Sequence, residues 1–134
     1  MRNTILFLLL IFTFSSCDKT SEKGGYHLYL EEVLGHAPDE SQQYVLVSDY
    51  SCSSCKGKVY REIEEKSSTK VYIILQPMNK VIIQDRFREA ISENRMIIDT
   101  ARLNLEKGVI IDKAVEVQFQ DGKWVVRELY GVIE

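Results

Sequence analysis

The sequence predicts an α/β fold in which a mixed central sheet is covered by helices and carries an antiparallel hairpin at one side. Apolar segments typical of buried strands, at residues 44–49, 70–75 and 95–99, alternate with segments whose apolar residues recur at helical spacing. Towards the C-terminus, the dipeptide Asp121-Gly122 separates two strand-like runs. Because this dipeptide favours a two-residue hairpin turn, the last two strands should be antiparallel.

The first part of the domain contains one ambiguous segment and one clear strand. Residues 26–30 alternate weakly and could form a strand, whereas residues 31–34 could extend them as a helix, so both structures remain open. Residues 35–43 contain Gly, Pro, Asp and Ser and predict a loop. Residues 44–49 are apolar on both faces, as expected of a central strand in a sheet covered on both sides.

Three helices are predicted between the later strands. Residues 52–66 have helical spacing and follow Ser51, which we expect to be the N-cap. Residues 80–94 form a second helix, and residues 100–107 form a short third helix with Gly108 as its C-cap. The apolar stripe of the second helix consists of Ile83, Phe87, Ala90 and Ile91.

The N-terminus has the features of a targeting segment. Arg2 supplies a positive charge, residues 5–14 are apolar but too short to span a bilayer comfortably, and Cys17 ends a stretch that resembles a bacterial lipobox. We therefore expect a lipoprotein signal peptide at residues 1–16 and lipidation of Cys17 with fatty acids such as palmitate, which would anchor the chain permanently. The alternative is an ordinary secretory signal in which Cys17 is incidental.

The remaining chain is then a short polar tether at residues 17–25 and one domain at residues 26–134. The anchored chain would lie at the inner or outer membrane of a bacterial cell envelope, with its domain facing the periplasm or the exterior. The sequence carries 17 basic and 20 acidic residues, a formal net charge of −3. This balance, with no basic block, argues against nucleic-acid binding and against electrostatic membrane binding. No catalytic triad, phosphate loop or paired-carboxylate site is evident.

Cys52 and Cys55 stand where the predicted strand 44–49 gives way to the predicted helix 52–66. Two thiols at this spacing can form a disulfide without moving the backbone. The first also lies at the positive end of the helix dipole, which favours its thiolate. If Cys17 is lipidated, these are the only two thiols left, so thiol–disulfide chemistry is the leading hypothesis.

Two other roles for this cysteine pair remain open. A structural disulfide is one, although closing so short a loop removes little entropy from the unfolded chain. Metal capture is the other, either of zinc or of copper. A zinc site needs four ligands, and beyond the two thiols the sequence offers only His27 and His36, which we expect to be surface residues. We expect no metal and no cofactor.

The chain resembles the thioredoxin-like superfamily, and its layout is most similar to envelope thiol–disulfide oxidoreductases and their lipoprotein relatives. The resemblance spans about residues 40–130 and is carried by strand 44–49, the motif Cys52-Ser53-Ser54-Cys55 with Lys56 behind it, and the hairpin at Asp121-Gly122. It implies a thioredoxin-like fold in which Cys52 attacks and Cys55 resolves the mixed disulfide.

The resemblance also implies partners and surroundings for the site. The substrates would be thiols or disulfides of envelope proteins, and we expect a monomer. Lys56 is near enough to help hold the thiolate, although we expect its side chain to point to solvent. Tyr50, two residues from Cys52, is expected to line the groove.

Two departures from the family pattern open a second hypothesis. Relatives place a cis-proline just before the first hairpin strand, whereas residues 111–116 contain no proline. Ser51 stands where many relatives carry tryptophan, and the strand lacks their buried acid, since Asp49 lies at an offset position. The second hypothesis is therefore a non-catalytic thioredoxin-like lipoprotein that binds a partner or supports an envelope complex.

Overall fold

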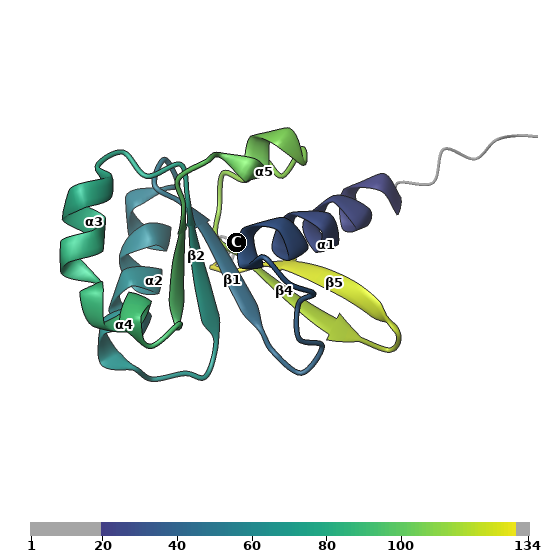
Figure 1. Cartoon of the computed structure of the whole chain (residues 1–134), viewed down its shortest axis with the longest axis horizontal. Coiled ribbons are helices and arrows are strands. Elements are labelled where there is room, and N and C mark those ends of the chain that lie inside the picture. Colours follow the sequence, from purple (N-terminus) through teal and green to yellow (C-terminus); the bar gives the residue numbers. More distant parts are fainter. Residues whose placement is uncertain (1–19, 131–134) are drawn as a thin grey trace, which may run out of the picture.

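The computed structural model describes residues 20–130, and their side chains from residue 25 onward. These residues form a five-stranded mixed sheet with helices on both faces, so the predicted α/β class is confirmed (Figure 1). The elements in chain order are α1 (Thr20–Leu34), β1 (Tyr44–Ser48), α2 (Ser53–Glu65), β2 (Val71–Leu75), α3 (Lys80–Arg86), α4 (Arg88–Ser92), β3 (Met96–Asp99), α5 (Leu103–Glu106), β4 (Val115–Gln120) and β5 (Lys123–Glu128).

The strands lie in the order β3-β2-β1-β4-β5. Strands β1, β2 and β3 are parallel to one another, whereas β4 is antiparallel to both β1 and β5. The β4–β5 connection is the predicted hairpin, and Asp121 and Gly122 adopt φ angles of 51° and 77°. Two consecutive positive φ angles are those of a type I′ turn, which matches the right-handed twist of paired strands.

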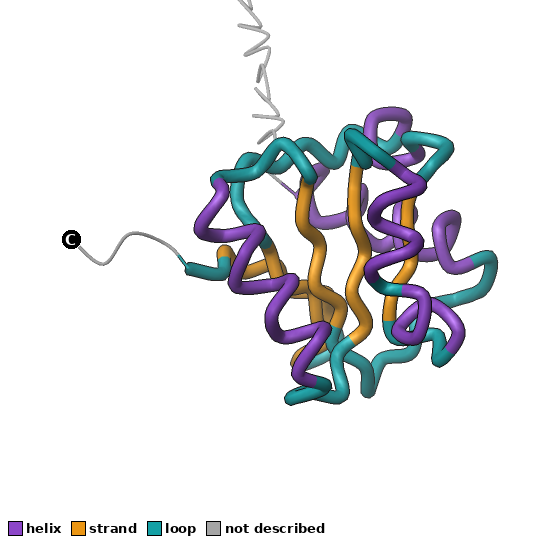
Figure 2. The backbone as a smooth tube through the Cα atoms, turned by 90° about the vertical axis from the view of Figure 1, so that its left-hand side faces the viewer, coloured by secondary structure: helices purple, strands orange, loops and turns teal. Residues whose placement is uncertain are grey.

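The core lies on both faces of the central strand β1, all of whose residues are buried. Val45 and Val47 pack on one face with α2, α3 and α4, the face toward the viewer in Figure 2. Tyr44 and Leu46 pack on the other face, where Tyr29 and Leu30 of α1 cover the sheet. This alternation explains why the sequence of β1 is apolar at consecutive positions.

The structure decides one open segment and corrects one helical prediction. The ambiguous residues 26–34 belong to helix α1, which begins at Thr20, because Tyr29 and Leu30 are fully buried against the sheet. The helix predicted at residues 80–94 is divided into α3 and α4 at Phe87, whose φ of −111° leaves the helical range. The buried Phe87 ring packs edge-on against Tyr60, with 5.0 Å between ring centroids.

The short third helix, predicted at residues 100–107, is present as α5 but begins only at Leu103, and Gly108 has a φ of 69° just beyond its end. The Gly108 N–H bonds to the Leu105 carbonyl and the Val109 N–H to the Asn104 carbonyl, the pair of hydrogen bonds that commonly ends a helix at glycine. Residues 1–16 and Cys17, the predicted signal and lipidation site, lie outside the described residues. Within residues 20–130, no helix combines the length and apolar character needed to span a membrane.

Candidate functional site

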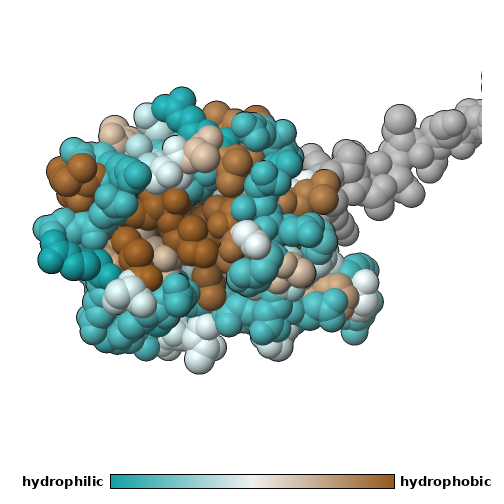
Figure 3. Space-filling model, in the orientation of Figure 1, coloured by the Kyte–Doolittle hydropathy of each residue, from teal (hydrophilic) through white to brown (hydrophobic). Residues whose placement is uncertain are grey.

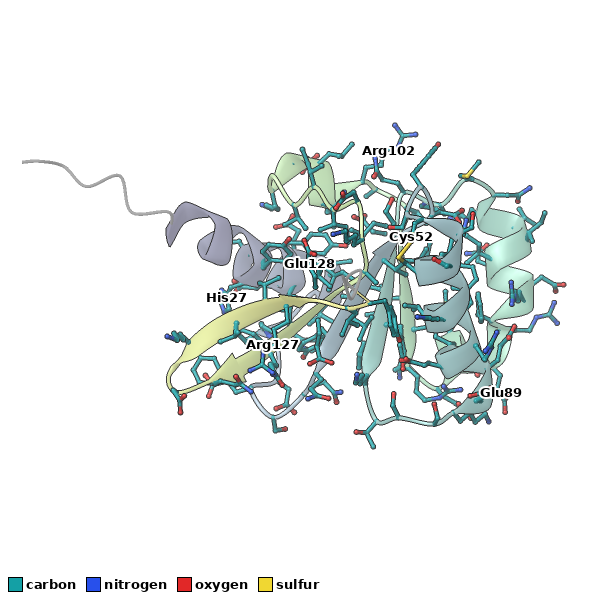
Figure 4. The ribbon with its side chains drawn as sticks, turned by 180° about the vertical axis from the view of Figure 1, so that it is seen from behind. His27, Cys52, Glu89, Arg102, Arg127 and Glu128 are labelled. Atoms are coloured by element: carbon teal, nitrogen blue, oxygen red, sulfur yellow. A yellow bond between two sulfur atoms is a disulfide. The ribbon has the colours of Figure 1, made fainter. Side chains whose placement is uncertain are left out.

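The cysteine motif lies at the carboxyl end of β1, at the end of the sheet shown at the top of Figure 4. The loop that follows β1 begins against the end of β2, because the Asp49 N–H bonds to the Leu75 carbonyl over 3.0 Å. The segment before β4 reaches the same end, since Val115, the first residue of the antiparallel strand β4, pairs with Leu46 near the end of β1. Connecting segments at the carboxyl ends of strands commonly form binding sites in α/β proteins.

Cys52 and Cys55 form a disulfide, with 5.3 Å between their Cα atoms. Cys52 is exposed, whereas Cys55 is buried with 6% of its surface accessible. The asymmetry follows from position, because Cys52 precedes helix α2 and Cys55 lies in its first turn, facing the core. A sulfur nucleophile from another protein can therefore reach Cys52 but not Cys55.

The N-cap of α2 is Cys52, so the prediction that Ser51 would cap this helix is wrong. The Cys55 N–H donates to the Cys52 Sγ over 3.2 Å, which places the helix N-terminus against the sulfur. The Ser54 hydroxyl lies 3.5 Å from the same sulfur. The Ser51 hydroxyl is instead buried, without a hydrogen-bond partner among the described residues. The amide and the Ser54 hydroxyl are the groups that can stabilise a thiolate on Cys52.

Asp49 is the buried acid of this site, and one carboxylate connects three segments. Its Oδ1 accepts hydrogen bonds from the Lys56 Nζ at 2.9 Å and from the Tyr60 hydroxyl at 3.2 Å. Its Oδ2 accepts a hydrogen bond from the Met78 N–H at 2.8 Å. The carboxylate therefore holds helix α2 and the β2–α3 loop against the end of β1.

Lys56 does not point to solvent, contrary to the prediction. Its ammonium bonds to both the carbonyl and the carboxylate of Asp49, each over 2.9 Å, and its side chain is only 25% exposed. Because its charge is paired with Asp49, Lys56 offers less electrostatic support to a thiolate on Cys52 than an unpaired cation would.

The surroundings of Asp49 shift two pKa values in opposite directions. Burial would raise the pKa of Asp49, but the hydrogen bonds from Lys56 and the Met78 N–H, together with the Lys56 charge, outweigh it and lower the pKa. Burial raises the pKa of Tyr60, and the neighbouring Asp49 charge raises it further. Asp49 is therefore ionised and Tyr60 neutral at ordinary pH.

The two histidines do not join the cysteine pair. His27 packs against Trp124 with 5.7 Å between ring centroids, and Figure 4 shows it well away from Cys52. It is only half-buried, and His36 is exposed, with its Nδ1 2.8 Å from the Ala37 carbonyl. Within the described part of the chain, no group of three or more His, Cys, Asp or Glu side chains is placed to hold a metal ion.

The segment before β4 differs from the pattern of the resembled family. Residues 112–114 read Asp-Lys-Ala, and the peptide bonds of the described residues are all trans. The Lys113 ammonium pairs with Glu128 of β5 over 3.1 Å. The Tyr50 side chain is 68% exposed, so it lies at the rim of the site in contact with solvent.

Sequence reasoning missed two contributors to this site. No role was predicted for Ser54, although its hydroxyl lies 3.5 Å from the Cys52 sulfur. Met78 had no sequence signal, since its role comes from a backbone N–H that reaches a carboxylate 29 residues earlier.

Comparisons of the chain with models of known protein families, with curated proteins and with solved structures find no match.

Proposed function

We propose that this chain is a thioredoxin-like protein that exchanges thiols and disulfides with other proteins through Cys52 and Cys55. The observation that carries the proposal is the asymmetric pair itself: an exposed sulfur at a helix N-terminus bonded to a buried one in the next turn. Support also comes from the mixed sheet, in which the motif follows a central parallel strand and an antiparallel hairpin completes the sheet.

In the reductive direction, the Cys52 thiolate attacks a partner disulfide. A Cys52–partner disulfide forms, the partner disulfide breaks, and one partner thiolate leaves and takes a proton from solvent. The Cys55 thiolate then attacks the Cys52 sulfur, which restores the Cys52–Cys55 disulfide and releases the second partner thiol. In the oxidative direction the same steps run in reverse, and the reduction potentials of the two proteins decide which direction prevails.

A trapping experiment tests these roles. Cys55→Ala should accumulate mixed disulfides through Cys52, because the resolving thiol is gone, and the adducts should disappear on reduction with dithiothreitol. Both variants carry Cys17→Ser, and Cys52→Ala is the matched control, since its one remaining thiol, that of Cys55, is buried. Equal trapping by the two variants would contradict the assignment.

The second candidate is a non-catalytic thioredoxin-like protein that binds a partner or supports an envelope complex. It is favoured by the segment at residues 112–114, which has no proline where the resembled family carries one beside its dithiol. Insulin reduction and the reduction potential of the pair separate the two candidates. A potential below about −300 mV together with no turnover would favour a structural bridge.

We further propose that the chain is anchored in a bacterial cell envelope through a lipid on Cys17. Support comes from the sequence alone: Arg2, the apolar residues 5–14 and the lipobox-like stretch before Cys17. Metabolic labelling with a palmitate analogue should mark the wild-type chain and leave Cys17→Ser unlabelled. Equal labelling of both chains would contradict the anchor.

A further inference from the structure

Strand β5 leaves one edge of the sheet open. Among the described strands it pairs only with β4, and the β4–β5 hairpin extends away from α2, α3 and α4 (Figure 1). All six residues of β5 pair with β4 without a bulge, and none of them is proline. The strand at the other edge of the sheet, β3, has only four residues. Proteins commonly protect an edge with a proline, a bulge or a short strand, because unpaired backbone groups can pair with another chain. The edge of β5 has none of these three protections.

Alternate residues of β5 direct their backbone N–H and C=O groups away from β4. The Leu129 N–H, just beyond the strand, bonds to the Ala114 carbonyl over 2.8 Å, so the backbone groups of residue 129 face β4. This direction alternates along a strand of an antiparallel pair. The residues whose backbone groups face β4 are therefore Lys123, Val125 and Arg127, and those whose groups face outward are Trp124, Val126 and Glu128.

The charges of β5 determine how a second copy of the same edge pairs with it. In an antiparallel pair of identical edges, residues with outward-facing groups lie opposite one another, and two registers then overlap over all but one residue of the strand. One register places Lys123 opposite Arg127 of the second copy, and this happens twice. Like charges directly opposite each other destabilise a sheet. The other register is centred on Val126 and places no two like charges of β5 directly opposite each other.

The register centred on Val126 also uses every outward-facing backbone group of β5. Val126 lies opposite Val126 of the second copy, and Trp124 lies opposite Glu128. Each of these pairs exchanges two hydrogen bonds. The Glu128 carboxylate keeps its own cation, because the Lys113 ammonium is 3.1 Å away. On the side of the molecule shown in Figure 3, the surface of the hairpin is mainly hydrophilic, so this edge is recognised through its backbone and its charges.

We propose that the β5 edge binds the β5 edge of a second copy of this chain, which joins the two sheets around a two-fold axis at Val126. The proposed dimer replaces the monomer that we expected from the family resemblance. Because the same edge serves both copies, the contact closes at two chains and leaves no open end for a filament. Antiparallel pairing reverses the strand direction, so the two Cys52–Cys55 disulfides lie at opposite ends of the joined sheet.

The test measures the mass of the full-length chain with Cys17→Ser, which prevents a disulfide between copies through this residue. The protein is kept in dodecyl maltoside because residues 5–14 are apolar, and light scattering after size-exclusion chromatography reports the mass of protein without detergent. We expect twice the mass of one chain at high concentration and the mass of one chain after dilution.

A substitution at the two-fold axis tests the register. Val126→Pro should raise the dissociation constant of the dimer at least about tenfold, because it removes two hydrogen bonds at the axis. The Val126 N–H points away from β4, a position at which an edge strand tolerates proline. Val126→Thr is the matched control, since it keeps the N–H and a β-branched side chain, and it should dimerise like the wild type.

Hydrogen exchange in the wild-type protein, read by NMR, locates the contact even if Val126→Pro fails to fold. The amides of Trp124, Val126 and Glu128 should exchange at least about tenfold more slowly in the dimer than after dilution. The amides of Val125 and Arg127 should be protected at both concentrations, because they face β4. A chain that keeps the mass of a monomer up to about 1 mM would overturn the proposal. A dimer in which the three outward amides exchange as fast as in the monomer would also overturn it, because its contact would lie elsewhere.

Discussion

Removing the Asp49 carboxylate should destabilise the protein by about 2–4 kcal/mol. In Asp49→Ala, the Met78 N–H and the Tyr60 hydroxyl lose their acceptor. The buried Tyr60 hydroxyl left unpaired costs about 1–3 kcal/mol, and the lost bond of the part-buried Met78 N–H costs about 1 kcal/mol. The Lys56 ammonium keeps its bond to the residue-49 carbonyl, and its side chain is 25% exposed. Losing its ion pair with the carboxylate therefore adds only about 0.5 kcal/mol. Asp49→Asn keeps the shape and one acceptor oxygen, and we expect it to cost about 1–2 kcal/mol.

The pH dependence gives an independent check with a definite sign. Because the pKa of Asp49 is lowered in the folded chain, the ionised carboxylate contributes stability that is fully present above its unfolded pKa of about 4. That contribution is lost as the pH falls through the lower, folded pKa. The stability difference between the wild type and Asp49→Asn should therefore be largest near neutral pH and shrink in acid.

Urea unfolding of the oxidised protein, followed by Trp124 fluorescence or circular dichroism, measures both effects. Lys66→Met is a suitable control, because it removes a lysine whose ion pair with Glu89 is exposed, with side chains 45% and 68% accessible. We expect this control to change stability by less than about 0.5 kcal/mol. An Asp49→Ala variant as stable as the wild type, or a difference that grows in acid, would refute the role given to this carboxylate.

Three smaller changes follow from neighbouring features. Ser51→Ala should stabilise the protein by about 1 kcal/mol in urea unfolding, because a buried hydroxyl without a partner among the described residues is removed; a loss of stability would contradict this. Ser54→Ala should slow alkylation of Cys52 in the reduced protein about threefold at mildly acidic pH, because the thiolate loses a donor, and an unchanged rate would exclude that contact. Gly122→Ala should cost about 1–2 kcal/mol in thermal unfolding from its φ of 77° alone, since a Cβ there meets nothing within 4 Å; an unchanged midpoint would contradict this.

The sequence predicted the parts of the fold that depend on local pattern. Strand β1 was recognised because it is apolar at consecutive positions, and the structure shows those positions dividing between two core clusters. The hairpin was recognised because Asp121-Gly122 tolerates positive φ at both residues. The exposure of Cys52 and the burial of Cys55 also follow from local position, since Cys52 precedes the helix and Cys55 lies in its first turn.

The features that were missed depend on contacts between distant residues. Helix α1 was ambiguous because its buried residues Tyr29 and Leu30 are adjacent in sequence. The Tyr29 hydroxyl bonds to Asp99, 70 residues away. Lys56 was expected in solvent because its partner, Asp49, becomes its neighbour only after the chain turns from β1 into α2. The secondary-structure propensity of a short segment carries no information about contacts between distant residues, and such tertiary contacts override it.

Asp49 joins the segments that surround the cysteine motif on the β2 side. The carboxylate binds α2 through Lys56 and Tyr60, and it binds the β2–α3 loop through the Met78 N–H. These bonds fix Met78 relative to the helix that carries the disulfide. A buried acid bonded to several donors is rigid, because moving any one segment would leave a charged or polar group unpaired. The helix that carries the disulfide and the β2–α3 loop are therefore positioned by the same side chain.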